Sequence, residues 1–201
     1  SLLRRGRLRD GELSVWDTAL VLHGIEIHNS RVQQIKELEP YLLTYLNRFE
    51  LCDIQSVELR YLQGWDKSIT LNEAFKSSTN GDIEKGYTRY GPHRADLKLL
   101  VNSVPANEYL SRGQQKAFHI CLKLAQSQVI KDRVGKKSIY LLDDITSELD
   151  EQNLQKVYQC LYEWDAQLFI TTLECPKQTR NRINQSIKMF HVEHGEISCI
   201  D

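Results

Sequence analysis

The chain has 201 residues, of which 41% are hydrophobic and 26% are charged, and its formal net charge is −1. These values are typical of soluble globular proteins and exclude long disordered tracts and fibrous repeats. The balanced charge also removes the simplest argument for nucleic-acid binding, a strongly basic chain, so any such contact must use local patches.

Cysteine usage and hydropathy bear on the compartment. Five cysteines stand far apart without a C-x-x-C pair, which is typical of a reducing compartment. No apolar run approaches the roughly 18 residues that cross a bilayer, and there is no secretory start. We therefore expect a cytoplasmic protein with no membrane partner. Because the chain begins at Ser1 within basic, leucine-rich sequence, we also expect a piece of a longer protein.

The first quarter of the chain predicts one long amphipathic helix. Apolar residues recur at helical spacing from about Ser14 to Phe49, and a bend would fall at Pro40. Such a helix needs a partner along its apolar stripe, either an upstream helix or the body of the domain. We expect residues 1–55 to form a helical arm, part of a coiled-coil-like lobe, and residues 56–201 to form the head.

The middle of the chain predicts short elements bounded by turn residues. They are a strand at Ser56–Leu62, a helix at Leu71–Ser77, and strands at Tyr87–Tyr90 and Asp96–Val101 hinged at Gly91-Pro92-His93-Arg94.

After Leu110, helices and strands alternate, the pattern of a partly parallel sheet. The expected elements are a helix from Arg112 to about Asp132, a strand at Ser138–Leu142, a helix at Asp150–Tyr162, a strand at Gln167–Thr171, a short helix near Pro176–Asn181, and closing strands at Ile187–Val192 and Glu196–Ile200.

Two acids, Asp143 and Asp144, directly follow the apolar strand that ends at Leu142. The carboxyl edge of a parallel sheet is where such folds bind ligands, so a Mg²⁺ site is expected there. In an NTPase the first acid holds the metal through water, and the second positions or deprotonates the attacking water. A capped strand-to-helix turn would give the same letters, and Asp150 is placed to cap the next helix.

The other candidate site is the start of the helix at residue 112. Ser111 at the N-cap and Gly113 in an amide-rich first turn form an anion site aimed along the helix axis. The alternative is an ordinary capped helix start.

Taken together, these motifs resemble the second half of an ABC-type ATPase head. Leu110-Ser-Arg-Gly-Gln-Gln-Lys116 is similar to the signature motif, the strand ending in Asp143-Asp144 to Walker B, and Ser147-Glu-Leu-Asp150 to the D-loop. Within that superfamily, Gln63-Gly-Trp-Asp66 and Tyr90-Gly-Pro-His-Arg-Ala-Asp-Leu97 resemble the RecF family, over about residues 63–150. The resemblance implies an α/β fold: the C-terminal part of an ABC-type head with the P-loop NTPase fold, a mixed sheet and flanking helices.

A P-loop, G-x-x-x-x-G-K-[ST], is missing from the sequence. Gly81–Gly86 has the glycine spacing but is followed by Tyr87, and in Gly135–Ser138 the glycine-lysine pair is present but Ile130 stands where the first glycine belongs. The family carries this loop in its N-terminal part. We therefore expect the chain alone to be inactive as an ATPase.

The resemblance also implies roles for individual residues. Two heads would dimerise around ATP, with the signature residues Ser111, Arg112, Gly113 and Gln114 contacting the γ-phosphate in trans. Asp143 would support Mg²⁺, Asp144 would activate water, and Ser147, Glu148 and Asp150 would lie at the dimer seam. Many relatives have glutamate at the position of Asp144, so hydrolysis is expected to be slow. Thr171 and Thr172 stand where many relatives have a switch histidine.

The function implied is that of an ATP-dependent DNA-binding protein of replication, recombinational repair and the SOS response. Duplex and gapped or junction DNA, RecR and RecO are the implied partners, RecA loading is the implied outcome, and the whole protein would be a slow DNA-dependent ATPase. Three alternatives stay open: an SMC-like or Rad50-like head, a non-catalytic module that docks a partner through the arm, and a metal nuclease. The nuclease lacks further ligands at sensible spacing.

Overall fold

The computed structural model describes residues 12–51, 54–144, 151–163, 167–172 and 188–200. The chain folds as two compact units, residues 1–136 and 137–201. Within the described residues, no helix is long and apolar enough to span a membrane. The predicted division into an arm and a head at residue 55 stays a prediction.

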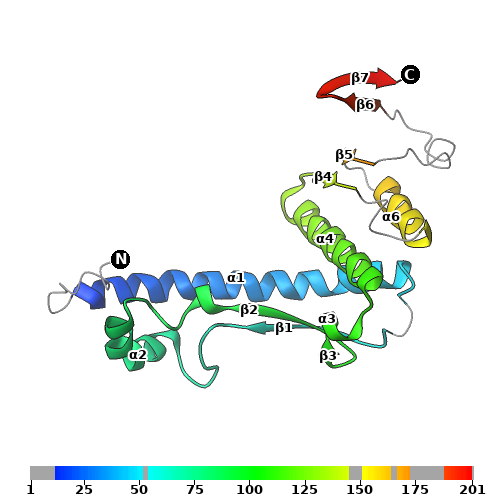
Figure 1. The fold of residues 1–201 in the computed structure, drawn as a ribbon. Coiled ribbons are helices and arrows are strands. Elements are labelled where there is room, and N and C mark those ends of the chain that lie inside the picture. The colour runs from blue at the N-terminus through cyan, green and yellow to red at the C-terminus, as the bar shows by residue number, and fades with distance from the viewer. Residues whose placement is uncertain (1–11, 52–53, 145–150, 164–166, 173–187, 201) are drawn as a thin grey trace. The chain divides into compact units, whose positions relative to one another are not determined.

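The first unit is built along one long helix, α1, at Glu12–Arg48 (Figure 1). It continues through Pro40, so the helix is not ended there. Its last turns are buried at Leu38, Leu42, Tyr45 and Leu46, and Phe49 just after the helix is buried too, whereas Trp16, Leu20 and Leu22 nearer its start are exposed. The apolar stripe is therefore covered only in part.

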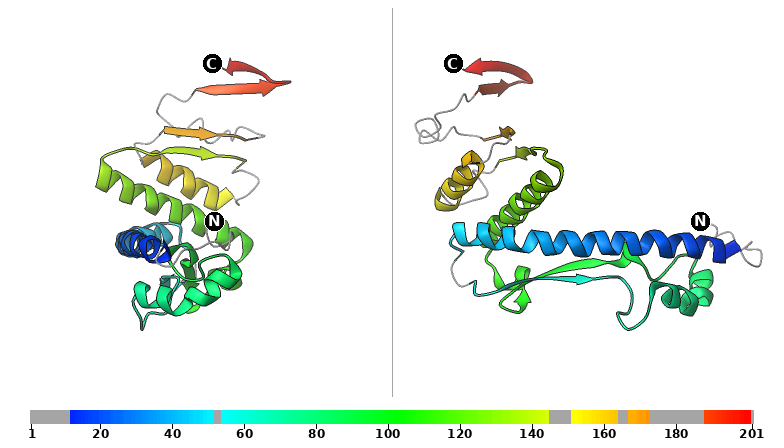
Figure 2. Two further views of the ribbon diagram at one scale, coloured as in Figure 1. Left: turned by 90° about the vertical axis from the view of Figure 1, so that its left-hand side faces the viewer. Right: turned by 180° about the vertical axis from the view of Figure 1, so that it is seen from behind.

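A three-stranded antiparallel sheet runs alongside α1 (Figure 2). β1 at Val57–Leu62 pairs with β2 at Asp96–Val101, with Val57 opposite Val101 and Leu62 opposite Asp96. β3 at Val104–Pro105 follows a tight turn at Asn102-Ser103, where both residues have positive φ. Asn102 Oδ1 accepts hydrogen bonds from the amides of Gln55 and Ser56, which closes this end of the sheet.

The helix predicted at Leu71–Ser77 is longer than expected, because α2 spans Leu71–Lys85. In the part beyond Ser77, the buried Ser78 hydroxyl donates to Phe75 O at 3.2 Å and to Asp82 Oδ2 at 2.9 Å, so its polar group is satisfied inside the helix. A capping box between Thr70 and Glu73 fixes the start of α2.

The strand predicted at Tyr87–Tyr90 is wrong, because these residues form bends and irregular backbone. The backbone amide of Arg89 donates to the Asp82 carboxylate, at 3.3 Å, instead of to a neighbouring strand. A 3₁₀ turn, η2, at Pro92–Arg94 then leads into β2. The predicted hinge at Gly91–Arg94 is thus present, but it joins a loop to a strand.

The first unit closes with α3 at Ala106–Tyr109 and α4 at Arg112–Val134. One face of α4 is buried, at Ala117, Phe118, Cys121, Leu124, Ala125 and Val129. Burial of a leucine or phenylalanine side chain stabilises a fold by about 1.5–3 kcal/mol. Arg133 on α4 also makes a two-pronged ion pair with Glu37 on α1, with N···O distances of 2.5 and 2.7 Å.

The second unit contains a β–α–β segment and a hairpin. β4 at Ile139–Leu142 and β5 at Gln167–Ile170 are parallel neighbours, with Ile139 opposite Gln167 and Leu142 opposite Ile170. The helix α6 at Glu151–Glu163 lies between these strands in sequence. β6 at Met189–Glu193 and β7 at Glu196–Ile200 form an antiparallel pair. The short helix predicted near residues 176–181 lies outside the described residues.

Candidate nucleotide site

Asp143 and Asp144 follow β4 directly, at the carboxyl end of a strand that has a parallel neighbour, as the sequence predicts. The ladder continues one step past the strands, because Thr171 N donates to Leu142 O at 2.9 Å. Asp144 has φ of +45°, in the left-handed region that aspartate tolerates at a cost of roughly 1 kcal/mol. The chain therefore turns sharply immediately after Asp143.

Thr171 connects the two acids. Its hydroxyl donates to Asp143 Oδ1 at 2.5 Å and accepts from the backbone amide of Asp144 at 2.9 Å. One hydroxyl thus bridges the ends of two strands that are 28 residues apart in sequence. The structure brings together three of the predicted site residues, and Thr172 is the next residue along the chain.

The donor set at this edge fits a magnesium ion. Mg²⁺ prefers oxygen ligands and is usually bound by one or two carboxylates together with substrate phosphates and water. Asp143 provides such a carboxylate, on the exposed side of the strand end. Among the described residues, no group of three His, Cys, Asp or Glu side chains could hold a metal by itself. The D-loop residues Ser147, Glu148 and Asp150 lie outside the described residues.

The signature helix starts with a complete capping box. Ser111 Oγ accepts from the Gln114 amide at 3.3 Å, and Gln114 Oε1 accepts from the Ser111 amide at 2.9 Å. This is the ordinary capped start that the sequence allowed as an alternative. It also fixes the first turn of α4, including Arg112, so that its remaining amides point along the helix axis.

Two features of this helix start bear on close approach by a ligand. A Cβ added to Gly113 would meet nothing within 4 Å, so the packing of this chain does not require glycine there. Gln115, which the sequence reasoning left without a role, donates to Leu110 O at 2.8 Å and Asn107 O at 3.0 Å. It thereby ties α4 to α3 and to Leu110, the residue that follows α3. Its only sequence signal was the amide-rich first turn.

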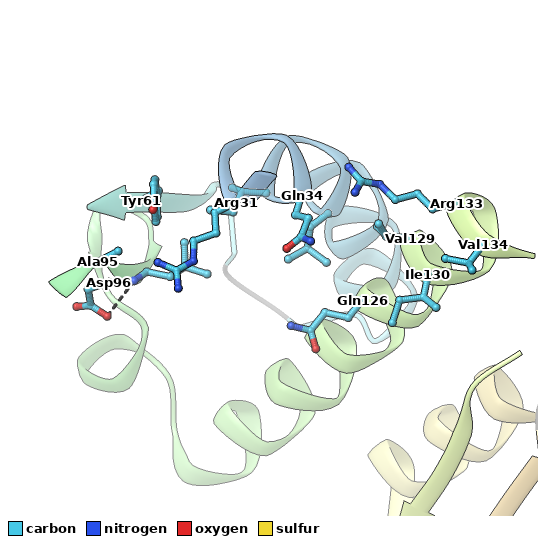
Figure 3. A pocket seen from close by; sticks show the side chains of 13 residues that line it. Arg31, Gln34, Tyr61, Ala95, Asp96, Gln126, Val129, Ile130, Arg133 and Val134 are labelled. Atoms are coloured by element: carbon cyan, nitrogen blue, oxygen red, sulfur yellow. Dashed lines mark hydrogen bonds between the residues drawn. The ribbon is translucent and has the colours of Figure 1, made fainter. Parts of the chain in front are cut away.

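The first unit also contains a cavity of about 620 Å³ between α1, the β1–β2 sheet and α4 (Figure 3). Arg31 and Arg133 both line it, but both are engaged within the chain. Arg31 donates to Pro92 O at 2.6 Å, and Arg133 is paired with Glu37. The hydrogen bond from Arg133 holds the pKa of Glu37 below its ordinary value. The cavity contains none of the predicted nucleotide residues.

Comparisons with known proteins agree with these motifs. A family model described as the RecF/RecN/SMC N terminal domain matches residues 15–198. A DNA replication and repair protein RecF from Cellvibrio japonicus (strain Ueda107) is 41% identical over 202 residues, which cover 99% of this chain and 55% of that protein. The corresponding protein of Vibrio atlanticus (strain LGP32) is 38% identical over 190 residues, covering 92% and 51%. The chain thus spans about half the length of these curated relatives.

A solved structure of the recombination mediator protein RecF with ATP, in the RecFOR pathway, matches with a TM-score of 0.76. The match covers 100% of this chain and 54% of that chain at 24% identity. A likeness of this kind shows the fold. The prediction of an α/β fold, part of an ABC-type ATPase head, is therefore confirmed.

Proposed function

Because this chain belongs to the RecF/RecN/SMC family, we propose that it supplies the signature and Walker B elements of a RecF-type ATPase of DNA replication and repair. The missing P-loop would come from an N-terminal half, since the chain spans about half of its relatives. The chain alone then binds ATP weakly or undetectably. Micromolar binding of a fluorescent ATP analogue to the chain alone would contradict the proposal that the main phosphate-binding loop lies outside it.

The hydrogen-bonded set of Asp143, Asp144 and Thr171 carries the proposal. A continuous apolar strand needs no acids at its end for stability, yet here two acids and a hydroxyl from the neighbouring strand converge. Thr171 holds one carboxylate oxygen of Asp143 and leaves the other available. Such an arrangement positions a carboxylate for a cation instead of burying it in a structural ion pair.

Each residue then has a distinct task. Asp143 would hold Mg²⁺, whose positive charge offsets that of the transferring phosphates. Asp144 accepts a hydrogen bond from the attacking water and orients it, with its backbone fixed by Thr171. Thr172, the next residue along the chain, would act at the same edge. Because the Asp144 side chain is one methylene shorter than the glutamate of many relatives, turnover is slow.

The start of α4 would act on the nucleotide that is bound by the other copy of a dimer. In a dimer of two complete heads, Ser111, Arg112, Gly113 and Gln114 of one copy contact the γ-phosphate held by the other. Open space around Gly113 allows close approach by a phosphate, and the helix dipole favours negative charge there. Ser147, Glu148 and Asp150 would lie at the dimer seam.

The proposed partners follow from the family. Duplex and gapped or junction DNA would be contacted mainly through phosphates, with strong salt dependence. RecR and RecO are the proposed protein partners, in loading RecA and in the SOS response. A cytoplasmic location stays a prediction from the cysteines.

ATP turnover by the chain joined to the P-loop half of a RecF relative tests the proposal. We expect slow turnover by the unaltered fusion, and Asp144→Asn to reduce it by about 100-fold while ATP binding persists, because only the water-orienting charge is lost. Glu196→Gln is the matched control, since it removes one exposed acid from the same unit. Equal turnover by Asp144→Asn and the control would overturn the proposal.

A second candidate, a non-catalytic module that docks a partner, is favoured by one observation. Trp16, Leu20, Leu22, Ile25 and Ile27 on the first half of α1 are all exposed. On this alternative, Asp144→Asn leaves every measurable function unchanged, and Leu22→Lys abolishes partner capture. The same pair of variants therefore separates the two candidates.

A further inference from the structure

A second cavity of the first unit, of about 450 Å³, lies between the loop after β1 and the turn before β2. Its lining combines cations and aromatic rings from these two segments: Leu62, Gln63, Gly64, Trp65, Asp66, Lys67, Arg89, Tyr90 and Arg94. None of these residues belongs to the proposed nucleotide site.

The two segments are locked together through their backbones. Gly91 N donates to Gly64 O at 3.1 Å. Gly64 has φ of +93°, and a Cβ there would stand 2.2 Å from Gly91 O, so only glycine fits. Gly91 also has a positive φ, of +129°. The two cavity walls are therefore joined by a backbone contact that requires glycine at position 64.

The ring of Trp65, which lines this cavity, packs against a histidine of α1. His28 on α1 lies with its ring centroid 5.2 Å from that of Trp65 and 5.6 Å from that of Tyr61. Tyr90, on the opposite segment, keeps 39% of its surface exposed. The rings of Trp65 and Tyr90 are thus presented by a rigid frame, as a stacking platform requires.

The three cations of the lining differ in how many interactions they already make within the chain. Arg89 is held by the buried Asp82, with Nε 2.8 Å from Oδ1, and it also donates to Ser78 O. The exposed Arg94 lies over the ring of Tyr87, with Cζ 5.6 Å from the ring centroid. Lys67 is exposed and makes no hydrogen bond to the other described residues. The single acid of the lining, Asp66, accepts from the amide and hydroxyl of Ser68. Two cations therefore remain for an anionic ligand.

We propose that this cavity binds an unpaired nucleotide of a DNA strand, with its phosphate on Arg94 and Lys67 and its base against Trp65 and Tyr90. Cations beside exposed rings are the combination that holds single-stranded nucleic acid, because every base has a face to stack. A base inside a duplex cannot reach the rings. The inference rests on the proposed role in DNA repair, and it locates that role at strand ends or gaps.

Fluorescence anisotropy tests the site with the chain itself and labelled oligo-dT of about 12 nucleotides, which spans one such site. No ATP is needed, so failure here would leave the ATPase proposal standing. We expect Arg94→Gln and Lys67→Gln each to weaken binding by about fivefold or more and to lower the slope of log affinity against log salt by about 0.7. Lys98→Gln, an exposed lysine on β2 outside the cavity, is the matched control.

The ring contact needs its own variants. We expect Tyr90→Ala to weaken oligo-dT binding by about fivefold or more, and a blunt duplex of the same length by less than about twofold, because only the unpaired base stacks. Tyr90→Phe keeps the ring and retains binding. Equal losses for Lys98→Gln and Arg94→Gln, or unchanged binding by Tyr90→Ala, would overturn the proposal. Complete competition by thymidine monophosphate at matched nucleotide concentration would instead assign the cavity to a free nucleotide and sink the strand proposal.

Discussion

The hydroxyl of Thr171 lies 2.5 Å from Oδ1 of Asp143, across the ends of the parallel strands β5 and β4. Neighbouring parallel strands end at the same edge of a sheet, so residues that follow them meet however far apart they are in sequence. A hydroxyl at this place donates to the carboxylate and, with the same oxygen, accepts from the amide of Asp144. A histidine there could carry a charge, whereas threonine cannot.

Removing the Thr171 hydroxyl tests whether this bridge matters for catalysis. We expect Thr171→Val in the P-loop-bearing fusion to lower the rate of ATP hydrolysis by about 10-fold, because Asp143 and the Asp144 backbone lose their shared partner. Thr171→Ser keeps the hydroxyl and restores most of the rate. A steady-state phosphate-release assay measures both. If valine and serine give the same rate, the bridge has no catalytic role.

A substitution at Gly113 tests whether glycine is needed there for ligand binding or for folding. Alanine is a better helix former than glycine by up to about 1 kcal/mol, and space is open at this position. We therefore expect Gly113→Ala to leave the urea midpoint of the chain unchanged or higher, yet to abolish ATP turnover by the fusion. The added methyl group would stand between the helix amides and a phosphate. Retained turnover would show that nothing approaches Gly113 closely.

Sequence reasoning succeeded where the deciding interactions are local. The starts of α2 and α4 are set by capping boxes within four residues, and β4 is a continuous apolar run. It failed at Tyr87–Tyr90, for which the sequence analysis predicts a strand. There Arg89 bonds instead to Asp82, seven residues earlier, and Gly86 ends α2 in a left-handed turn.

The remaining site residues depend on contacts between distant segments. The pair Asp143 and Asp144 was predicted from a strand end, and Thr171 from the family resemblance, as the residue in place of a switch histidine. In contrast, His28 lies within a long helix whose pattern gives it no distinction. It gains a role only because α1 packs against the loop carrying Trp65. Such a contact has no signature in local sequence, since neither segment constrains the other before folding.

The backbone contact at Gly64 predicts how strongly an alanine there lowers the stability of the chain, and Gly135 provides a matched control. We expect Gly64→Ala to lower the free energy of unfolding by about 2 kcal/mol or more, because its φ is unsuited to alanine and the new methyl group meets Gly91 O. Gly135→Ala has a comparable φ of +67° but open space around the Cβ, so its cost is about 1 kcal/mol. Urea denaturation followed by circular dichroism compares them. Equal costs would mean that the backbone contact with Gly91 yields readily.

His28 gives the chain a predicted sensitivity to acid. Burial lowers the pKa of His28 below its ordinary 6.5, and its buried Nδ1 has no hydrogen-bond partner among the described residues. Between the folded-state and unfolded-state pKa values, the unfolded chain therefore binds the extra proton, so stability rises with pH across that window and falls as pH drops below about 6.5. A substitution that removes the titrating ring tests this.

His28→Phe keeps a ring against Tyr61 and Trp65 but cannot titrate. We expect acidification from about pH 7.5 to about pH 5.5 to lower the melting temperature of the unaltered chain more than that of His28→Phe. His23→Phe, at an exposed histidine of the same helix, retains the full acid sensitivity. An NMR titration that places the pKa of His28 at or above 6.5 would contradict the burial argument directly, because the proton would then stabilise the folded state.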